Sequence, residues 1–236
     1  MQRVKILIGL FYLMVIGCFL FFLFSNFNLQ EISSYDFIKN NSNYFFELKN
    51  SNLFLLILIY ITLTILWIFA AGFGTPAALI AGFVFGKWLG LLLLVFSVAI
   101  GATCLYVFAN YFLKDFIKKN FLDKFNIFEK KFKKAEFTYL CIYRFIGGIP
   151  FPIANILPCL FNVKISNYFY AILIGITPQS FLMISIGSGL EKIIKKNLSA
   201  PKLTDLITSP DIYLPIIAFF VLFIMTIFVK KFFYKN

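Results

Sequence analysis

Long uncharged stretches alternate with short charged ones along this chain. Residues 6–24 carry no charge and, as a helix, would measure about 28 Å, close to the roughly 30 Å core of a bilayer. Residues 50–86 are also uncharged, but one helix of that length would be about 55 Å long, nearly twice the core. The pattern predicts an N-terminal segment, residues 1–52, with one anchor helix and a polar loop, and a break inside the second apolar stretch.

Glycine and proline place that break at residues 72–76. Both residue types are poor helix formers, so the second spanning helix is expected to cover Leu53–Ala71. Thr75 can cap a new helix with a proline at its first position, and the helix Pro76–Phe85 would reach only about 15 Å, half a bilayer. We therefore predict a first re-entrant hairpin over residues 72–88, formed by Gly74, Pro76, Gly82 and Gly86.

Charge returns in the middle of the chain. After a third predicted span, Leu89–Leu113, residues 114–136 carry eight lysines and four acids, while phenylalanines recur every three or four residues. One helix face is then apolar and the other charged, which is typical of an amphipathic helix lying on a membrane surface. A solvated connecting helix is the alternative interpretation.

Three prolines interrupt the next apolar stretch. Pro150, Pro152 and Pro158 stand within nine residues, so no regular spanning helix can pass through them. Together with Gly148 they predict a second re-entrant hairpin over residues 144–163.

Two further spans complete the prediction. Residues 165–190 are uncharged, with a kink expected at Gly175 and Pro178 and a loosened helix end at residues 187–189. Residues 191–236 are expected to form a polar loop and a C-terminal spanning helix.

A shift of 76 residues aligns the two hairpins. It lays Pro76 on Pro152 and Phe85 on Phe161, although few other positions match. One span separates the hairpins, so they should enter from opposite membrane faces, as in inverted-repeat transporters. The predicted fold class is an all-α polytopic membrane protein with about five spanning helices and two opposed re-entrant helical hairpins in a weak inverted repeat. Residues 53–190 form its membrane domain.

Composition narrows the class of protein. Of the 236 residues, 61% are hydrophobic and 20% aromatic, too many for the exterior of a soluble enzyme. The chain has no histidine, which excludes histidine triads and histidine proton relays. We expect no enzyme activity, no catalytic residue, no cofactor and no metal site, and the four cysteines fit as small core residues. The net charge of +12 suits anionic lipid rather than nucleic acid.

Three polar residues are candidates for substrate binding. Arg144, one of two arginines among 22 basic residues, stands just ahead of the second hairpin, and no predicted span supplies a carboxylate to pair with it. Its candidate partners are backbone carbonyls at a broken helix end, water or a lipid phosphate; the alternative is an arginine that reaches out to the membrane interface. Asn155 and Gln179 could bind a headgroup or satisfy backbone groups freed by nearby prolines.

The second hairpin carries a fairly specific block, RFIGGIPFPIANILPCL followed by GITPQ, and the first adds Pro76, Ala81-Gly82 and Phe85-Gly86. Between about residues 60 and 190 the chain resembles the SNARE-associated Golgi protein family, or VTT domain, of the DedA superfamily. The resemblance implies two facing re-entrant hairpins and lipid translocation or scrambling. Some relatives use proton motive force through acidic residues in the first hairpin. This chain lacks those acids and matches the arginine at Arg144, which favours passive lipid movement or a different coupling.

The leading hypothesis is an integral membrane protein that moves or scrambles phospholipid or lipid-phosphate between leaflets along a path lined by the two hairpins. A small-solute or ion transporter and a non-transport membrane organiser are the alternatives. The expected partners are membrane lipids with anionic headgroups and, in a homo-oligomer, further copies of the chain. The Lys-rich, Arg-poor composition favours an AT-rich bacterial genome, and hence a multi-pass protein of the bacterial inner membrane.

Overall fold

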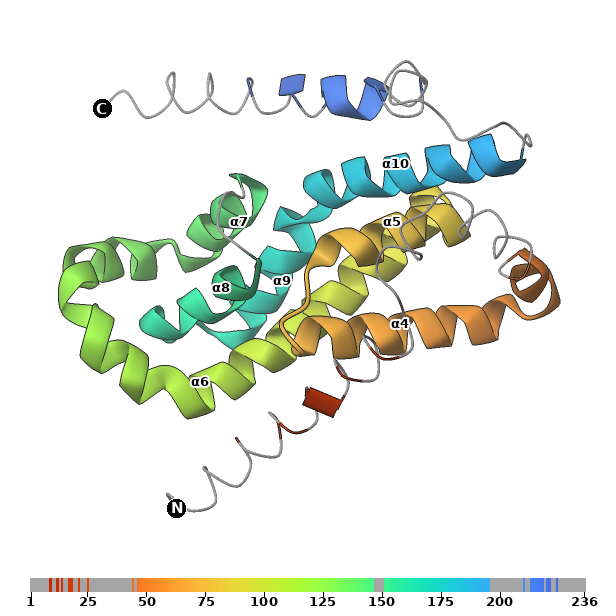
Figure 1. Ribbon diagram of the computed structural model, residues 1–236. Coiled ribbons are helices and arrows are strands. Elements are labelled where there is room, and N and C mark those ends of the chain that lie inside the picture. Colours follow the sequence, from red (N-terminus) through yellow and green to blue (C-terminus); the bar gives the residue numbers. More distant parts are fainter. Residues whose placement is uncertain are drawn as a thin grey trace.

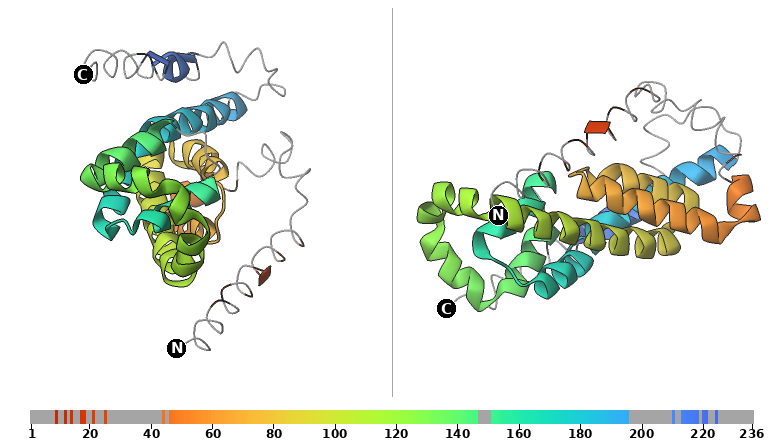
Figure 2. Two further views of the ribbon diagram at one scale, coloured as in Figure 1. Left: turned by 90° about the vertical axis from the view of Figure 1, so that its left-hand side faces the viewer. Right: turned by 90° about the horizontal axis from the view of Figure 1, so that it is seen from below.

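The computed structural model describes residues 44, 46–146 and 151–195, together with positions 9, 12, 14, 17, 18, 21, 25, 210, 213–218, 220, 221 and 224; the side chains of residues 113–131, 146, 152 and 193–195 fall outside this description. Every element within the described residues is a helix, and Figures 1 and 2 show the helices packed in an elongated bundle. The predicted all-α class is confirmed. The anchor helix expected in residues 1–52 and the span expected in residues 191–236 lie mostly outside the described residues.

The first hairpin is longer than the predicted residues 72–88: it starts with helix α4 (Leu53–Phe69), which the sequence predicts as a separate span. The N-cap Asn52 of α4 accepts a backbone hydrogen bond at 3.0 Å, and Tyr60 of α4 donates to the Ala77 carbonyl of α5. The helix ends two residues before the predicted limit. Its last carbonyls accept from the turn residues that follow, and the Trp67 indole donates to the Phe73 carbonyl oxygen at 2.7 Å. A Cβ on Gly72 would collide with this indole ring, so the break depends on glycine there.

Helix α5 (Gly74–Phe85) folds back along helix α6 (Lys87–Lys134) after a turn at Gly86. Gly86 has a φ of +76°, which a residue without a Cβ adopts readily. Gly90 of α6 packs against the Ala81 carbonyl of α5, so the two helices are antiparallel near the turn. The predicted turn at Gly86 is confirmed, while a re-entrant path through a bilayer stays a prediction.

The predicted start of α5 is wrong by two residues. Phe73 is the N-cap, without a side-chain hydrogen bond, and Thr75 lies inside the first turn. Pro76 fits this turn because the first N–H groups of a helix have no partner within it, so a proline there removes no hydrogen bond. Gly74 and Pro76 therefore start the helix, but Thr75 does not cap it.

Helix α6 has 48 residues and supports both hairpins. Its apolar part, Lys87–Phe112, has 26 residues and, at about 39 Å, is long enough to cross a bilayer. The surface helix predicted at residues 114–136 is not a separate element. Its backbone continues α6 to Lys134, because neither glycine nor proline occurs between residues 102 and 134, and Figure 1 shows the helix curving there.

Short helical pieces stand in the second hairpin. Helix α7 (Glu136–Ile146), helix α8 (Phe151–Ile156) and the 3-10 helix η1 (Leu157–Phe161) confirm that no single regular helix passes through it. Pro152 and Pro158 lie in the first turns of α8 and η1.

The turns of the second hairpin are described in part. The predicted hairpin residues Gly148 and Pro150 lie outside the described residues. Asn162, with a φ of +47°, turns the chain out of η1 toward the next helix.

Helix α9 (Ile165–Gly175) and helix α10 (Thr177–Lys195) replace the predicted fourth span and meet at a bend of 44°. Pro178 lies in the first turn of α10, so the predicted kink is confirmed. In the described part of the chain, α6 passes a length and hydropathy test for a membrane span by itself, and α9 with α10 passes it as a bent pair. The expected number of about five spans stays a prediction.

Two glycines allow α5 and α10 to touch. A Cβ on Gly82 would collide with the Ile184 carbonyl of α10, and a Cβ on Gly187 would collide with the Leu79 carbonyl of α5. The prediction of a loosened helix end at residues 187–189 is therefore wrong. These residues lie inside α10, where their small size serves helix packing.

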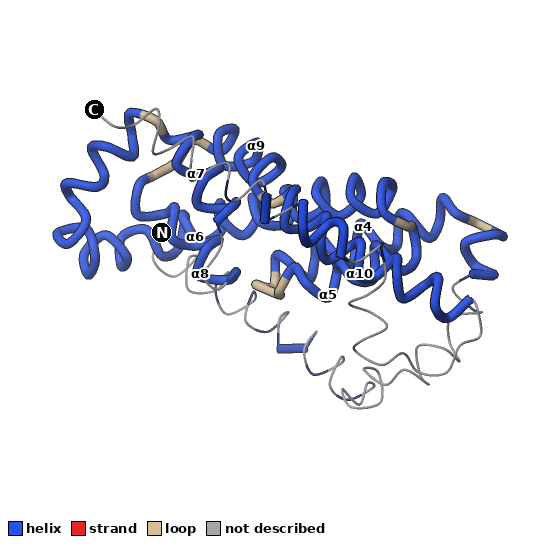
Figure 3. Tube along the Cα trace, turned by 90° about the horizontal axis from the view of Figure 1, so that it is seen from above, coloured by secondary structure: helices blue, strands red, loops and turns tan. Residues whose placement is uncertain are grey.

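The turns of the two hairpins lie toward opposite ends of the apolar part of α6. The turn of the first hairpin lies at the Lys87 end. The turn of the second lies farther along the helix, because the Tyr106 hydroxyl donates to the Val163 carbonyl at 2.8 Å. Figure 3 shows the described loops and turns as short segments between helical tubes. Both breaks therefore approach the middle of α6 from opposite directions.

The packing of two glycines agrees with the 76-residue repeat. In the first half, a glycine of α6 packs against α4, and in the second half a glycine of α9 packs against α7. Each glycine contacts one side chain and the backbone of the residue three positions earlier. These contacts are Gly101 with Ile68 and Ile65, and Gly175 with Arg144 and Cys141. The contacted residues of the two halves are 76 apart, as are the turn residues Gly86 and Asn162, which both have positive φ.

Candidate functional site

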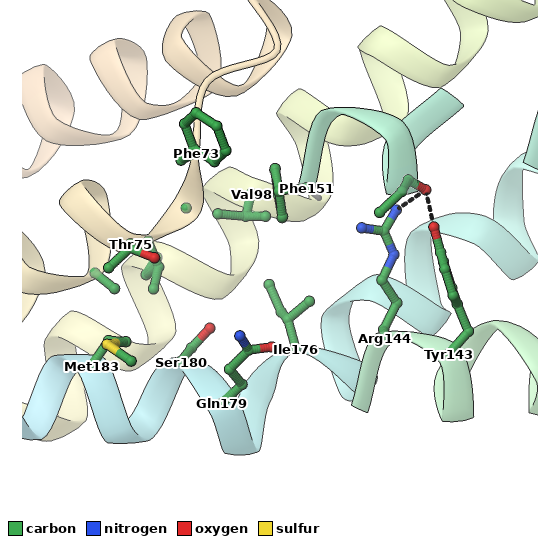
Figure 4. A pocket seen from close by; sticks show the side chains of 14 residues that line it. Phe73, Thr75, Val98, Tyr143, Arg144, Phe151, Ile176, Gln179, Ser180 and Met183 are labelled. Atoms are coloured by element: carbon green, nitrogen blue, oxygen red, sulfur yellow. Dashed lines mark hydrogen bonds between the residues drawn. The ribbon is translucent and has the colours of Figure 1, made fainter. Parts of the chain in front are cut away.

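A cavity of about 270 Å³ lies where the two breaks meet. The first hairpin contributes the start of α5, the second contributes Arg144 and the start of α8, and the bend between α9 and α10 completes the lining (Figure 4). Leu94 and Val98, near the middle of the apolar part of α6, also line it. The opposed hairpins therefore share one site.

The guanidinium of Arg144 is held inside the protein. The side chain is 5% exposed, and its Nη2 donates to the Ala154 carbonyl at 3.1 Å, to Asn155 Oδ1 at 2.7 Å and to the Tyr168 hydroxyl at 2.9 Å. The expected partner, a backbone carbonyl at a broken helix end, is confirmed. The alternative of an arginine reaching out to the membrane interface is wrong.

Proline chemistry explains why the Ala154 carbonyl is available. In a regular helix this carbonyl would accept from the amide four residues later, which belongs to Pro158 and has no N–H. The orphaned oxygen instead accepts from Arg144 and from the Tyr143 hydroxyl. Pro158 therefore creates the acceptor that anchors the cation.

All the hydrogen-bond partners described for Arg144 are neutral. Aromatic rings surround its Cζ, at 5.3 Å from the centroid of Tyr143, 5.6 Å from Tyr168 and 5.8 Å from Phe151. Dipoles and ring faces stabilise a buried cation without cancelling its charge. The site can therefore still attract an anion.

Part of this guanidinium faces the cavity. Its Nε makes no hydrogen bond within the described residues, and Figure 4 shows the terminal nitrogen that does not contact Ala154 turned toward the side where Phe151 and Ile176 lie. A buried donor without an acceptor is unfavourable. An oxyanion would offer acceptor oxygens to the free donors of Arg144 and a negative charge to balance that of the guanidinium.

Asn155 holds Arg144 rather than lining the cavity. It is fully buried, and its Oδ1 accepts from Arg144 and, at 3.3 Å, from the Tyr168 hydroxyl. Its Nδ2 makes no hydrogen bond within the described residues. The sequence suggests that Asn155 either satisfies free backbone groups or binds a headgroup directly. In the structure its amide oxygen accepts from side chains, and the residue does not line the cavity.

Tyr168 is one of the site residues that the sequence does not single out, as are Tyr143 and Phe151. It is fully buried, stacks on Tyr106 with ring centroids 4.5 Å apart, and donates to the Asn155 backbone carbonyl at 3.2 Å. Its hydroxyl also accepts from Arg144. The available signal was a tyrosine inside an apolar stretch, because a buried phenol needs a hydrogen-bond partner.

Gln179 lines the cavity, as expected of a binding residue, and its side chain is exposed. Thr75 and Ser180 join it, so three neutral polar side chains gather in this part of the site (Figure 4). The three come from both sides of the cavity, since Thr75 belongs to α5 and the other two to α10.

The start of α5 adds an electrostatic contribution. Gly74 and Thr75 line the cavity, and their helix has no side-chain cap at its N-terminus. The first N–H groups of a helix are unpaired and carry the positive end of its dipole. Both hairpins thus present positive potential to the same space.

The described residues contain no group of three or more His, Cys, Asp or Glu side chains that could hold a metal ion.

Two of the curated relatives that match the chain are both named Transmembrane protein 41 homolog. The relative from Dictyostelium discoideum is 25% identical over 139 residues, 56% of this chain and 42% of its own length; the relative from Caenorhabditis elegans is 23% identical over 136 residues, 55% of each chain. This chain therefore spans about half the length of the curated relatives it matches. Their names agree with the predicted membrane location, but both organisms are eukaryotes, so the bacterial inner membrane stays a prediction. No solved structure matches.

The VTT domain family matches residues 72–189, half of the chain. This range includes both breaks, the whole of α6 and every residue that lines the cavity. The match confirms the resemblance seen in the sequence, and the chain belongs to the VTT domain family.

Proposed function

We propose that this chain is a multi-pass membrane protein that moves lipids between bilayer leaflets through a path lined by its two broken hairpins. One observation carries the proposal: both breaks meet at a cavity that contains a buried cation with only neutral partners among the described residues. A charge at membrane depth is energetically unfavourable, and ionisable residues found there usually serve a function, so Arg144 is the group on which the proposal depends.

Membrane placement follows from α6. If its apolar part spans the bilayer, Lys87 and Trp88 lie at one interface, where Trp88 is 74% exposed. The cavity, which lies beside Leu94 and Val98, then lies near mid-depth. Each hairpin would enter from one face, reach the middle and return to the same face, which is the definition of a re-entrant hairpin. Exposed apolar residues such as Leu63, Phe96 and Ile174 would face lipid chains.

The size of the cavity favours a headgroup over a whole lipid. Its volume of about 270 Å³ lies below the roughly 300–1,000 Å³ of pockets that enclose drug-sized ligands. In this mechanism the phosphate pauses beside Arg144, and the acyl chains remain in the bilayer. No covalent bond forms or breaks, so the proposal is for transport without enzyme chemistry.

The test is leaflet exchange in vesicles that contain purified protein. Phospholipids labelled on an acyl chain are added to one leaflet, and their arrival in the other is followed by quenching. We expect wild-type protein to accelerate exchange. Arg144→Gln, which retains a donor for Asn155 but no charge, should slow it by at least about tenfold, since a charged hydrogen bond is worth about 1.5–3 kcal/mol.

Lys164→Ala is the matched control, because Lys164 is an exposed cation outside the cavity. It should exchange lipid at the wild-type rate. If wild-type vesicles exchange no faster than empty ones for anionic and zwitterionic lipids alike, the proposal is wrong.

A second candidate is a transporter of a small anionic solute, which the small cavity also favours. It predicts thermal stabilisation by the solute without lipid exchange. A membrane organiser would instead depend on residues 114–136. Because these residues continue α6 into the second hairpin, point substitutions at their lysines test this alternative better than a deletion.

A further inference from the structure

The cavity has two chemically different parts. One contains Arg144, the residue of fixed charge among those that line the cavity. The other contains Thr75, Gln179 and Ser180, which are polar but neutral (Figure 4). A ligand that fills the cavity must suit both parts.

The first part requires an anion. The side chain of Arg144 is 5% exposed, and all three of its described hydrogen bonds start at Nη2. Its Nε has no hydrogen-bond partner within the described residues. The unpaired start of α5 adds positive potential. A phosphate group matches this donor-rich environment better than a neutral group does.

The second part requires a neutral group that donates and accepts hydrogen bonds. The hydroxyls of Thr75 and Ser180 and the amide of Gln179 can each do both, and a ligand hydroxyl has the same capacity. An ammonium group would meet no carboxylate among the described lining residues, and the rings of Tyr143 and Phe151 are already beside the guanidinium. A positively charged headgroup would therefore be repelled.

We propose that the cavity binds a phosphate ester whose other substituent carries free hydroxyls, as in a phosphoglycerol or phosphoinositol headgroup. The phosphate contacts Arg144, and the hydroxyls contact Thr75, Ser180 and Gln179. That this phosphate ester belongs to a lipid rests on the proposed function. Soluble glycerol phosphate carries the same chemical groups.

The experiment compares lipids with identical labelled acyl chains and different headgroups. Phosphatidylglycerol should exchange at least about fivefold faster than phosphatidylcholine, and faster than phosphatidate, which lacks the hydroxylated substituent. The double variant Thr75→Val, Ser180→Ala should remove the advantage of phosphatidylglycerol over phosphatidate. Arg144→Gln should slow all anionic lipids.

Thr64→Val with Ser185→Ala is the matched control, since both hydroxyls are buried but neither residue lines the cavity. It should retain the headgroup preference. Gln179→Leu on the exposed rim gives an independent variant with little risk to folding, and it should also reduce the preference.

The outcomes separate the two proposals. Protein-dependent exchange at one rate for all headgroups overturns the headgroup inference and leaves lipid movement standing. No exchange of any lipid, combined with stabilisation by soluble glycerol 3-phosphate that Ser180→Ala weakens, supports the ligand chemistry and overturns the lipid function. No exchange and no stabilisation overturns both.

Discussion

The two hairpins solve the same backbone problem with different chemistry. In the first, neutral donors close the break after α4: turn amides, the Trp67 indole and the Tyr12 hydroxyl, which donates to the Phe69 carbonyl at 2.7 Å. In the second, a cation takes this role, because Arg144 donates to the Ala154 carbonyl. Under the 76-residue shift, Arg144 corresponds to the fully buried Ile68. Equivalent positions therefore serve packing in one half and chemistry in the other.

The largest expected effect comes from substituting these two equivalent positions. Arg144→Gln should abolish most lipid exchange, whereas Ile68→Ala should destabilise the protein by about 2–5 kcal/mol, the range for a large buried residue cut to alanine, and leave the exchange rate per folded molecule unchanged. Exchange assays and thermal unfolding in detergent check the pair. Equal loss of exchange in both variants would show that the halves are not functionally distinct.

The two packed glycines sharpen the same contrast. A Cβ would lie 2.8 Å from the Ile65 carbonyl at Gly101 and 2.7 Å from Arg144 Cβ at Gly175. Overpacking of this kind costs about 1–3 kcal/mol, so Gly101→Ala and Gly175→Ala should lower the unfolding temperature to a similar extent. Only Gly175→Ala displaces the guanidinium and should slow exchange. The prediction fails if Gly101→Ala slows exchange equally.

A smaller effect is expected from the stacked tyrosines. Tyr168→Phe removes an acceptor for Arg144, and Tyr106→Phe removes a hydrogen bond to the Val163 carbonyl. Each hydroxyl contributes about 1 kcal/mol, which corresponds to about fivefold. Tyr168→Phe should change exchange and headgroup preference, and Tyr106→Phe should change stability alone. A loss of headgroup preference in Tyr106→Phe would contradict the assignment.

The smallest expected effect is none at all. No predicted span carries a carboxylate, and the described lining of the cavity contains neither His, Asp nor Glu. A proton gradient should therefore not change the exchange rate. Vesicles with and without an imposed pH difference, compared with and without a protonophore, test this directly. A rate that rises with the gradient would indicate a coupling residue outside the described lining.

Local chemistry made much of the fold predictable. Glycine and proline disrupt helices at their own positions, so the helix breaks in both hairpins and the kink near Pro178 could be predicted from the sequence. The change from apolar to charged residues after Leu113 predicts a boundary there, but the sequence contains no helix breaker at that point, and α6 continues to Lys134.

Tertiary contacts were harder to foresee. Gly187 lies against α5, a helix some 100 residues earlier in the chain, so its neighbours in sequence gave no sign of that role. Arg144 was predictable because an isolated charge in an apolar stretch needs an explanation. The part played by Tyr168 was not, because it arises only when α9 packs beside α7 and brings the phenol to the guanidinium.

The absence of one hydrogen atom at Pro158 has a wider consequence. Because the proline ring nitrogen cannot donate, the Ala154 carbonyl lacks its helical partner. It accepts a hydrogen bond from Arg144 of α7 instead of from solvent. Restoring the amide with alanine would let the backbone compete for the same oxygen and free the side chain that depends on it. The backbone hydrogen bond that Pro158 cannot make thus fixes the orientation of the guanidinium.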